Sequence, residues 1–211
     1  MLSPYNLNFL VNQSTLIEEH IAGIPGDHFI KEFLPQCTDA EKAQIAKEYV
    51  KFNERSMIRL LGDMRAYNYV VVPTHDFDQV VYKIRPIDFD QQSFEGKLSV
   101  YRPQFFKENK ALMDLVRTKL NHNSINQYKI EERSIVARRI ISSGSRLQSL
   151  VRIMQSETLT LQENLERLRQ EIFKFTKDKA FKQSESMGDI MQASLRFVRL
   201  HYEKVDMHNL F

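Results

Sequence analysis

The pattern of apolar and polar positions begins with two short strands and a turn. Residues 8–20 contain two apolar runs around a polar break at residues 12–14, and each run is predicted to form a strand. Residues 23–26 contain two glycines and a proline and are predicted to form a turn. Asp27 can cap a short helix through Leu34, which we expect Pro35 to end.

A long helix and a β-hairpin are predicted next. Thr38 and Glu41 have the spacing of a capping box, and apolar residues then recur at helical intervals, so we expect one helix to about Leu61. A β-branched run at residues 69–72 and a strand-like run at residues 80–87 flank a polar, turn-like segment. Two such runs are predicted to pair as a hairpin.

The second half of the chain is predicted to be helical. From Pro103 onward apolar residues return to helical spacing, and Phe106 lies on the first stripe. Further helical pieces are expected at residues 125–141, 147–154, 161–175 and 190–202. The leucine spacing in the third piece is similar to a coiled-coil seam, but a short seam is more typical of a helix packed in a core. The predicted fold class is therefore α+β, mostly α.

Composition narrows the classes of protein. Of 211 residues 42% are hydrophobic, enough for a core, and the single cysteine, Cys37, excludes an intramolecular disulfide. With no apolar run of about 20 residues and no signal-peptide pattern at the start, we expect a cytoplasmic protein with no membrane association. The net charge is only +3, which does not favour nucleic acid as a partner. A local basic excess is formed by Lys129, Arg133, Arg138, Arg139, Arg146 and Arg152.

Three polar residues have the types and order that phosphoryl transfer requires. Asp63 is followed five residues later by Asn68, and Asp88 follows the second strand of the predicted hairpin. Phosphoryl transfer uses an Asp to orient or deprotonate the acceptor hydroxyl, and an Asn and a second Asp to hold Mg²⁺ against the nucleotide phosphates. Taken singly, Asp63 and Asn68 are equally well explained as residues of an ordinary turn.

Residues 60–92 resemble the catalytic core of the protein-kinase-like superfamily, especially its aminoglycoside-phosphotransferase and choline-kinase-like branch, whose loop is roughly H-G-D-x-x-x-x-N. Residues 15–25 resemble the hinge that joins the two lobes of such enzymes. The resemblance implies a kinase-like C-terminal lobe with the small hairpin at its active face, and ATP and Mg²⁺ as cofactors. The resemblance implies that Asp63 is the catalytic residue and that Asn68 and Asp88 are metal ligands. It also implies that the cofactor is bound by Glu18, Glu19, His20 and Ile21.

Two departures from the family pattern shape the expectations. Leu61 stands where the family usually has His, and the first lysine, Lys31, comes after the hinge-like segment. No glycine-rich loop or strand lysine therefore precedes the hinge, so we expect either a piece of a longer kinase or a chain without ATP-dependent activity. The expected division is hinge strands and linker at 1–24, a catalytic lobe core at 25–122 and a C-terminal helical part at 123–211.

Three functional hypotheses follow. The first is a phosphotransferase that moves the γ-phosphoryl group of ATP to an unidentified hydroxyl acceptor. The second is a non-catalytic kinase-like binding or regulatory module, and the third and weakest is a helical nucleic-acid-binding protein built on the basic segment. An apolar lobe face left bare would favour self-association or a protein partner.

Overall fold

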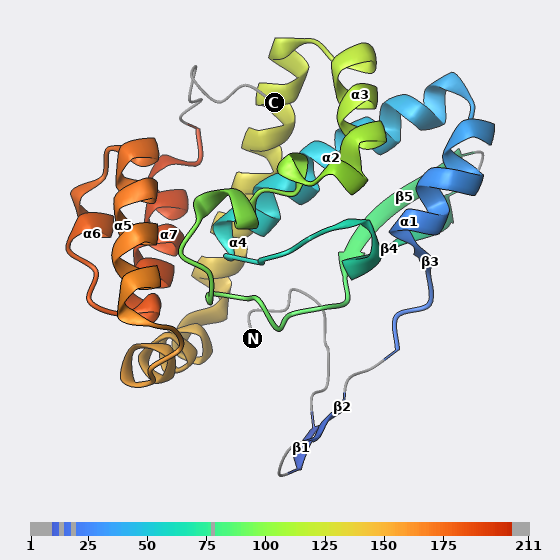
Figure 1. Cartoon of the computed structure of the whole chain (residues 1–211). Coiled ribbons are helices and arrows are strands. Elements are labelled where there is room, and N and C mark those ends of the chain that lie inside the picture. Colours follow the sequence, from blue (N-terminus) through green and yellow to red (C-terminus); the bar gives the residue numbers. More distant parts are fainter. Residues whose placement is uncertain (1–9, 13–14, 18–19, 77–78, 204–211) are drawn as a thin grey trace.

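The structure, a computed structural model, describes residues 10–12, 15–17, 20–76 and 79–203. Within these residues the chain is mostly helical, with a small three-stranded antiparallel sheet at one side (Figure 1). The expectation of an α+β, mostly α protein is therefore confirmed. None of the helices in this part of the chain is both long and apolar enough to cross a membrane.

The strands form two separate sheets. The two strands predicted near the start are present as β1 (Leu10–Asn12) and β2 (Thr15–Ile17), and they pair with each other. The second sheet has the order β3-β4-β5, in which β3 (Ile24–Pro25) borders the hairpin of β4 (Tyr69–Asp76) and β5 (Gln79–Pro86). The predicted hairpin is therefore present; β4 is longer than expected, whereas β5 has the expected length and begins one residue earlier.

Pro73 is the reason that the sequence underestimates β4. The segment at residues 73–79 was expected to be a turn, but Pro73 lies opposite Tyr82 in the strand ladder, and pairing continues to Asp76. β3 pairs only with Val70 and Val71, so β4 is an edge strand from that point on. An edge strand accommodates a proline, because the missing N–H costs no interior ladder bond.

The segment before the long helix is a run of short helical turns. It comprises α1 (Gly26–His28), the π-helical turn η1 (Phe29–Phe33) and the 3-10 turn η2 (Leu34–Gln36). The expectation that Pro35 ends this helix is wrong. Pro35 occupies an early position of η2, where its missing N–H needs no partner.

The long helix α2 (Asp39–Ile58) begins as predicted. The Thr38 hydroxyl accepts from the backbone N–H of Glu41 at 3.3 Å, and the Glu41 carboxylate accepts from the backbone N–H of Thr38 at 2.8 Å, which completes the capping box. The helix ends at Ile58, three residues before the predicted Leu61, because Leu60 has a left-handed backbone conformation.

The C-terminal part is helical, with one difference from expectation. Residues 98–109 form 3-10 turns, η4 (Leu98–Tyr101), η5 (Pro103–Phe105) and η6 (Lys107–Asn109), so the helix expected from Pro103 starts only at Lys110. The remaining helices are α3 (Lys110–Lys119), α4 (His122–Ser156), α5 (Gln162–Thr176), α6 (Lys179–Lys182) and α7 (Met187–His201). Gly144 interrupts α4 with φ 47° and ψ −130°, between the two helical pieces that the sequence predicts there.

Two hydrophobic clusters form the core, and α2 contributes to both. The first lies between the hairpin sheet, α2 and α3, and includes the buried side chains of Tyr49, Phe52 and Tyr69. The second lies between the end of α2 and helices α4, α5 and α7, and includes Ile58 and Leu168. α4 also borders both clusters, and the expected division between residues 122 and 123 stays a prediction.

Candidate functional site

The end of α2 sets the direction of the loop that carries Asp63. Leu60 has φ 50°, its N–H donates to the carbonyl of Met57 at 3.2 Å, and the N–H of Leu61 donates to the carbonyl of Ser56 at 2.9 Å. These two bonds define a Schellman cap, a position where glycine is usual and a leucine is strained. The cap turns the chain sharply out of the helix into residues 59–68, the Asp63 loop.

Asp63 lies at the centre of its loop in a left-handed conformation, with φ 54°. Its N–H donates to the carbonyl of Val100 at 3.1 Å, and its own carbonyl accepts from the N–H of Arg65 at 2.7 Å. Asp is among the few residues that adopt this conformation at low cost. The local geometry therefore suits the residue type, and the Asp63 side chain keeps about a quarter of its surface exposed, at 27%.

Asn68 joins the Asp63 loop to residues 87–93, the Asp88 loop. Its side-chain Nδ2 donates to the backbone carbonyl of Asp63 at 2.8 Å, and its backbone carbonyl accepts from the N–H of Ile87 at 3.0 Å. Since Nδ2 donates to Asp63, Oδ1 is the side-chain atom of Asn68 that remains as an acceptor. Asn68 thus lies between the two acidic residues that the sequence singles out.

The Asp88 loop carries two carboxylates on a buried anchor. Phe89 is 9% exposed and belongs to the first hydrophobic cluster, and the Oδ1 atom of Asp88 accepts from the backbone N–H of Asp90 at 3.2 Å. Burial raises the pKa of Asp88, and the negative charges of Asp90 and Asp63 raise it further. The carboxylates are therefore close enough to repel one another, a condition that a bound cation would relieve.

Gly62 is required because the two loops touch. A Cβ atom at this position would overlap the backbone oxygen of Gln91 and lie 2.8 Å from its Cβ. Two further bonds close the same contact: the N–H of Ser93 donates to the carbonyl of Leu60 at 2.9 Å, and Gln92 Nε2 donates to the carbonyl of Arg59 at 3.2 Å. The loops are therefore held in one fixed arrangement.

Arg65 is a member of the site that the sequence interpretation missed. Its Nε donates to Asp63 Oδ1 at 2.6 Å, its Nη1 donates to the Tyr67 hydroxyl at 3.2 Å, and its guanidinium lies 5.3 Å from the centre of the Phe106 ring. These contacts orient the Asp63 carboxylate and place a positive charge beside it. The sequence signal that could have identified Arg65 is its position two residues after Asp63, because side chains with this spacing are within reach of each other in a tight turn.

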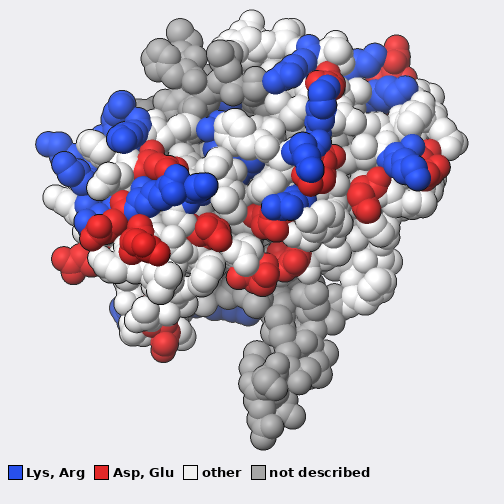
Figure 2. Space-filling model, in the orientation of Figure 1, with Lys and Arg blue, Asp and Glu red and all other residues white. Residues whose placement is uncertain are grey.

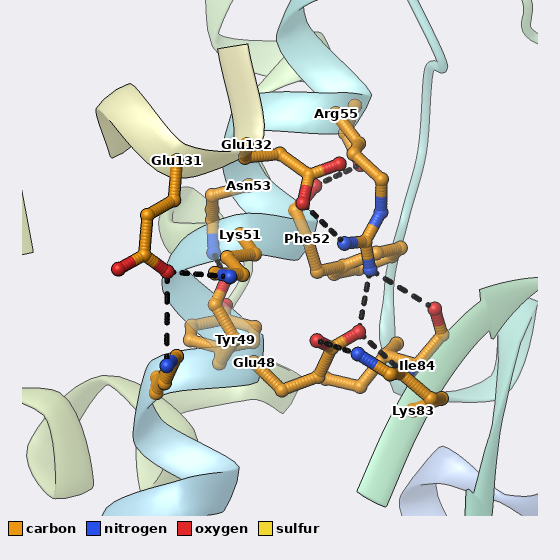
Figure 3. A network of polar contacts seen from close by, with 12 residues as sticks. Glu48, Tyr49, Lys51, Phe52, Asn53, Arg55, Lys83, Ile84, Glu131 and Glu132 are labelled. Carbon is orange, nitrogen blue, oxygen red and sulfur yellow. Dashed lines mark hydrogen bonds and ion pairs between the residues drawn. The ribbon is translucent and has the colours of Figure 1, made fainter. Parts of the chain in front are cut away.

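A buried network of charged residues holds β5 against α2 and α4 (Figure 3). Arg55 donates to Glu48 at 2.6 Å, to Glu132 of α4 at 3.2 Å and to the carbonyl of Ile84 in β5 at 3.3 Å. Glu48 also accepts from the backbone N–H of Ile84 at 3.2 Å. Because α2 and β5 lead into the two site loops, this network fixes both elements that carry the site.

The hinge-like residues are not brought to these loops in the part of the chain that is described. Glu18 and Glu19 lie outside the described residues. His20 is exposed and Ile21 is partly buried, before β3, and among the described contacts no hydrogen bond or ion pair joins either to the Asp63 or Asp88 loop. Their expected contact with the nucleotide stays a prediction.

The basic segment of α4 is divided between the interior and the surface. Lys129 is buried, and Arg133 pairs with Glu54 of α2 in a largely buried position. On the face drawn in Figure 2, the basic and acidic side chains of the described residues are interspersed. Neither observation favours a continuous phosphate-binding surface of the kind that non-specific nucleic-acid binding requires.

The two site loops carry oxygen atoms of the kind that Mg²⁺ binds. Among the described residues no group of three or more His, Cys, Asp or Glu side chains could hold a metal. Mg²⁺, however, commonly takes one or two protein oxygens and completes its shell with water and phosphate oxygens. Oδ1 of Asn68 and the carboxylate of Asp88 are oxygens of that kind.

Comparison with known proteins finds no family model, curated protein or solved structure that matches this chain.

Proposed function

We propose that this chain is the catalytic lobe of a kinase-like phosphotransferase, which transfers the γ-phosphoryl group of ATP to a hydroxyl acceptor. The observation that carries the proposal is the convergence of Asp63, Asn68 and Asp88, which come from two loops joined through Asn68. The absence of a side chain at Gly62 supports it, because the loops could not approach each other otherwise.

Each residue has a role that its environment supports. Asp63 is partly exposed and held by Arg65, so its second carboxylate oxygen can orient an acceptor hydroxyl and take its proton. Asn68 and Asp88 would hold Mg²⁺, which bridges and neutralises the nucleotide phosphates when bound. Arg65 fixes the carboxylate of Asp63 in one orientation, which favours a productive approach of the acceptor.

A second function, a non-catalytic kinase-like binding or regulatory module, is favoured by one specific observation. Leu61 is 1% exposed and is part of the first hydrophobic cluster, at the position where the resembled family usually has a histidine that supports the loop. In this hypothesis the loops serve as a rigid scaffold, and the acidic cluster binds no nucleotide.

Calorimetric titration separates the two hypotheses. ATP is titrated into the chain with and without Mg²⁺, beside Asp88→Ala and the control Asp90→Ala, which removes an exposed carboxylate of the same loop. We expect Mg²⁺-dependent binding that Asp88→Ala weakens by about tenfold or more, as for loss of a charged contact to the metal, and that Asp90→Ala largely retains. Equal binding by both variants contradicts the assigned metal site. If neither they nor the parent chain bind, the scaffold hypothesis is preferred.

A further inference from the structure

A groove runs between α4 and α7, and none of the residues that line it belongs to the proposed phosphotransferase site. α7 lies antiparallel to α4: Gln155, near the end of α4, donates to Asp189, near the start of α7, at 2.7 Å. Gly188 permits this close crossing, because a Cβ there would overlap the backbone of Met154 and Gln155. The groove has a volume of about 770 Å³, and Ala180, Gln183 and Ser184 also line it.

The floor of the groove is apolar. Val151 is 5% exposed and Ala193 and Leu195 are each 7% exposed, so they form a packed base rather than a loose surface. Ile140 and Leu147 continue this base as half-buried side chains, and Ile141 is 69% exposed at the edge. An apolar strip of this kind between two helices is typical of grooves that receive the apolar face of a third helix.

The walls of the groove are basic. Arg196 and Arg199 are three residues apart on α7 and so share one helix face, and Arg152 lies on the α4 side. All three are exposed, and among the described residues none has an ion-pair partner. The three arginines therefore present positive charge that the described chain does not neutralise.

The acidic residue in the groove already has its hydrogen-bonding capacity filled. Both oxygens of Asp189 are engaged: Oδ1 accepts from Gln155, and Oδ2 accepts from the backbone N–H groups of Glu185 and Ser186 at 3.1 and 3.0 Å and from the Ser186 hydroxyl at 3.0 Å. The carboxylate completes the capping box of α7. A ligand entering the groove thus meets arginines that are available and a carboxylate that is not.

We propose that this groove binds an amphipathic helical segment of another protein, with an apolar stripe on the floor and acidic side chains against the three arginines. On α7 the lining positions from Asp189 to Arg199 cover about 15 Å at 1.5 Å per residue, which matches a partner helix of about three turns. A nucleic acid would gain little from the apolar floor, and a bilayer surface does not fit a concave site.

The kink at Gly144 lies between the two parts of α4 that line the groove. Its φ of 47° and ψ of −130° belong to a region that residues with a side chain rarely adopt, and a Cβ built there would meet nothing within 4 Å. Gly144 is exposed and lines the groove itself, so Ile140 and Ile141 reach the groove from beyond the change in direction of α4.

The test uses a fluorescein-labelled synthetic helix of about 14 residues, with leucine along one stripe and glutamate elsewhere, and fluorescence anisotropy with the full chain. We expect Arg196→Glu/Arg199→Glu to weaken binding by about tenfold or more, since two attractive rim contacts become repulsive. Arg152→Glu, on the opposite wall, should weaken it in the same direction. The matched control Arg117→Glu/Lys174→Glu makes the same change in net charge away from the groove and should alter binding by less than about twofold.

Three further probes decide the kind of partner. A peptide of the same composition with its leucines scattered around the helix should bind at least about tenfold more weakly, because it cannot place a stripe on the floor. The proposal is overturned if the scattered peptide binds equally well, if no peptide binds, or if the groove variants bind as the parent chain does. Tighter binding of duplex DNA or of anionic vesicles, lost in Arg196→Glu/Arg199→Glu, would overturn it in favour of a nucleic acid or a membrane. These results do not depend on Asp63 or Asp88.

Discussion

Replacing Arg55 by leucine would remove the guanidinium that bridges two deeply buried carboxylates. Arg55 is 7% exposed, and its partners Glu48 and Glu132 are 3% and 5% exposed. Loss of one partner from a buried ion pair leaves charge in a poorly solvated place, which typically costs about 3–5 kcal/mol. The bond to the carbonyl of Ile84, which fixes β5, would be lost at the same time.

Urea unfolding followed by circular dichroism measures the loss in free energy of unfolding directly, and thermal unfolding gives the corresponding fall in melting temperature. For a chain of this size a loss of about 3–5 kcal/mol corresponds to a fall in melting temperature of roughly 6–20 °C. Arg55→Lys retains the charge but not the planar fork, so its loss of stability should be intermediate.

An exposed ion pair provides the control. Arg167 pairs with Glu171 at 3.0 Å on α5, and its side chain is 52% exposed, so Arg167→Leu should cost less than about 1 kcal/mol. If Arg55→Leu and Arg167→Leu shift the unfolding midpoint equally, the buried network does not hold β5 on α2, and the reasoning is refuted.

Two further predictions concern the site and the start of α2. Gly62→Ala should destabilise the fold by about 1–3 kcal/mol through overlap with Gln91 and abolish Mg²⁺-dependent ATP binding; unchanged unfolding and binding would contradict the tight loop contact. Hydrogen bonds from the backbone N–H of Thr38 and from the Tyr82 hydroxyl lower the pKa of Glu41. The charged form of Glu41 therefore stabilises the fold above the pKa of the unfolded state, and this contribution is lost as the pH falls. Glu41→Gln should therefore melt below the parent chain at pH 7, and the difference should shrink as the pH falls through the folded-state pKa of Glu41; a difference independent of pH would count against this account.

The predictions from sequence that the structure confirms depend on local signals. Thr38 and Glu41 predict the start of α2 because both capping bonds lie within four residues of each other. The hairpin follows from two β-branched runs, which need only each other as partners. The structure places Asp63, Asn68 and Asp88 together, and their roles in catalysis stay a prediction.

The features that sequence did not predict depend on distant contacts. Residues 103–109 have apolar spacing compatible with a helix, but Asn109 is fully buried and donates to the carbonyls of Met64 and Pro103 at 2.9 and 2.8 Å, which holds the segment in 3-10 turns. The burial of Glu48 and Arg55 could not be predicted, because nothing in the sequence distinguishes a buried charged residue of α2 from one on a solvated helix face. The contact between Gly62 and Gln91 likewise requires knowledge of how two loops meet.

The proline in β4 has a consequence for how this protein behaves in concentrated solution. Beyond Val71, the side of β4 that faces away from β5 has no neighbouring strand among the described residues, and such an edge can recruit a strand from another molecule. Pro73 has no N–H to offer a newcomer, and the exposed Thr74, His75 and Asp76 that follow it give that edge a polar surface. Pro73, which makes part of β4 resemble a turn in the sequence, thus also disfavours the addition of a strand from another molecule to this edge of the sheet.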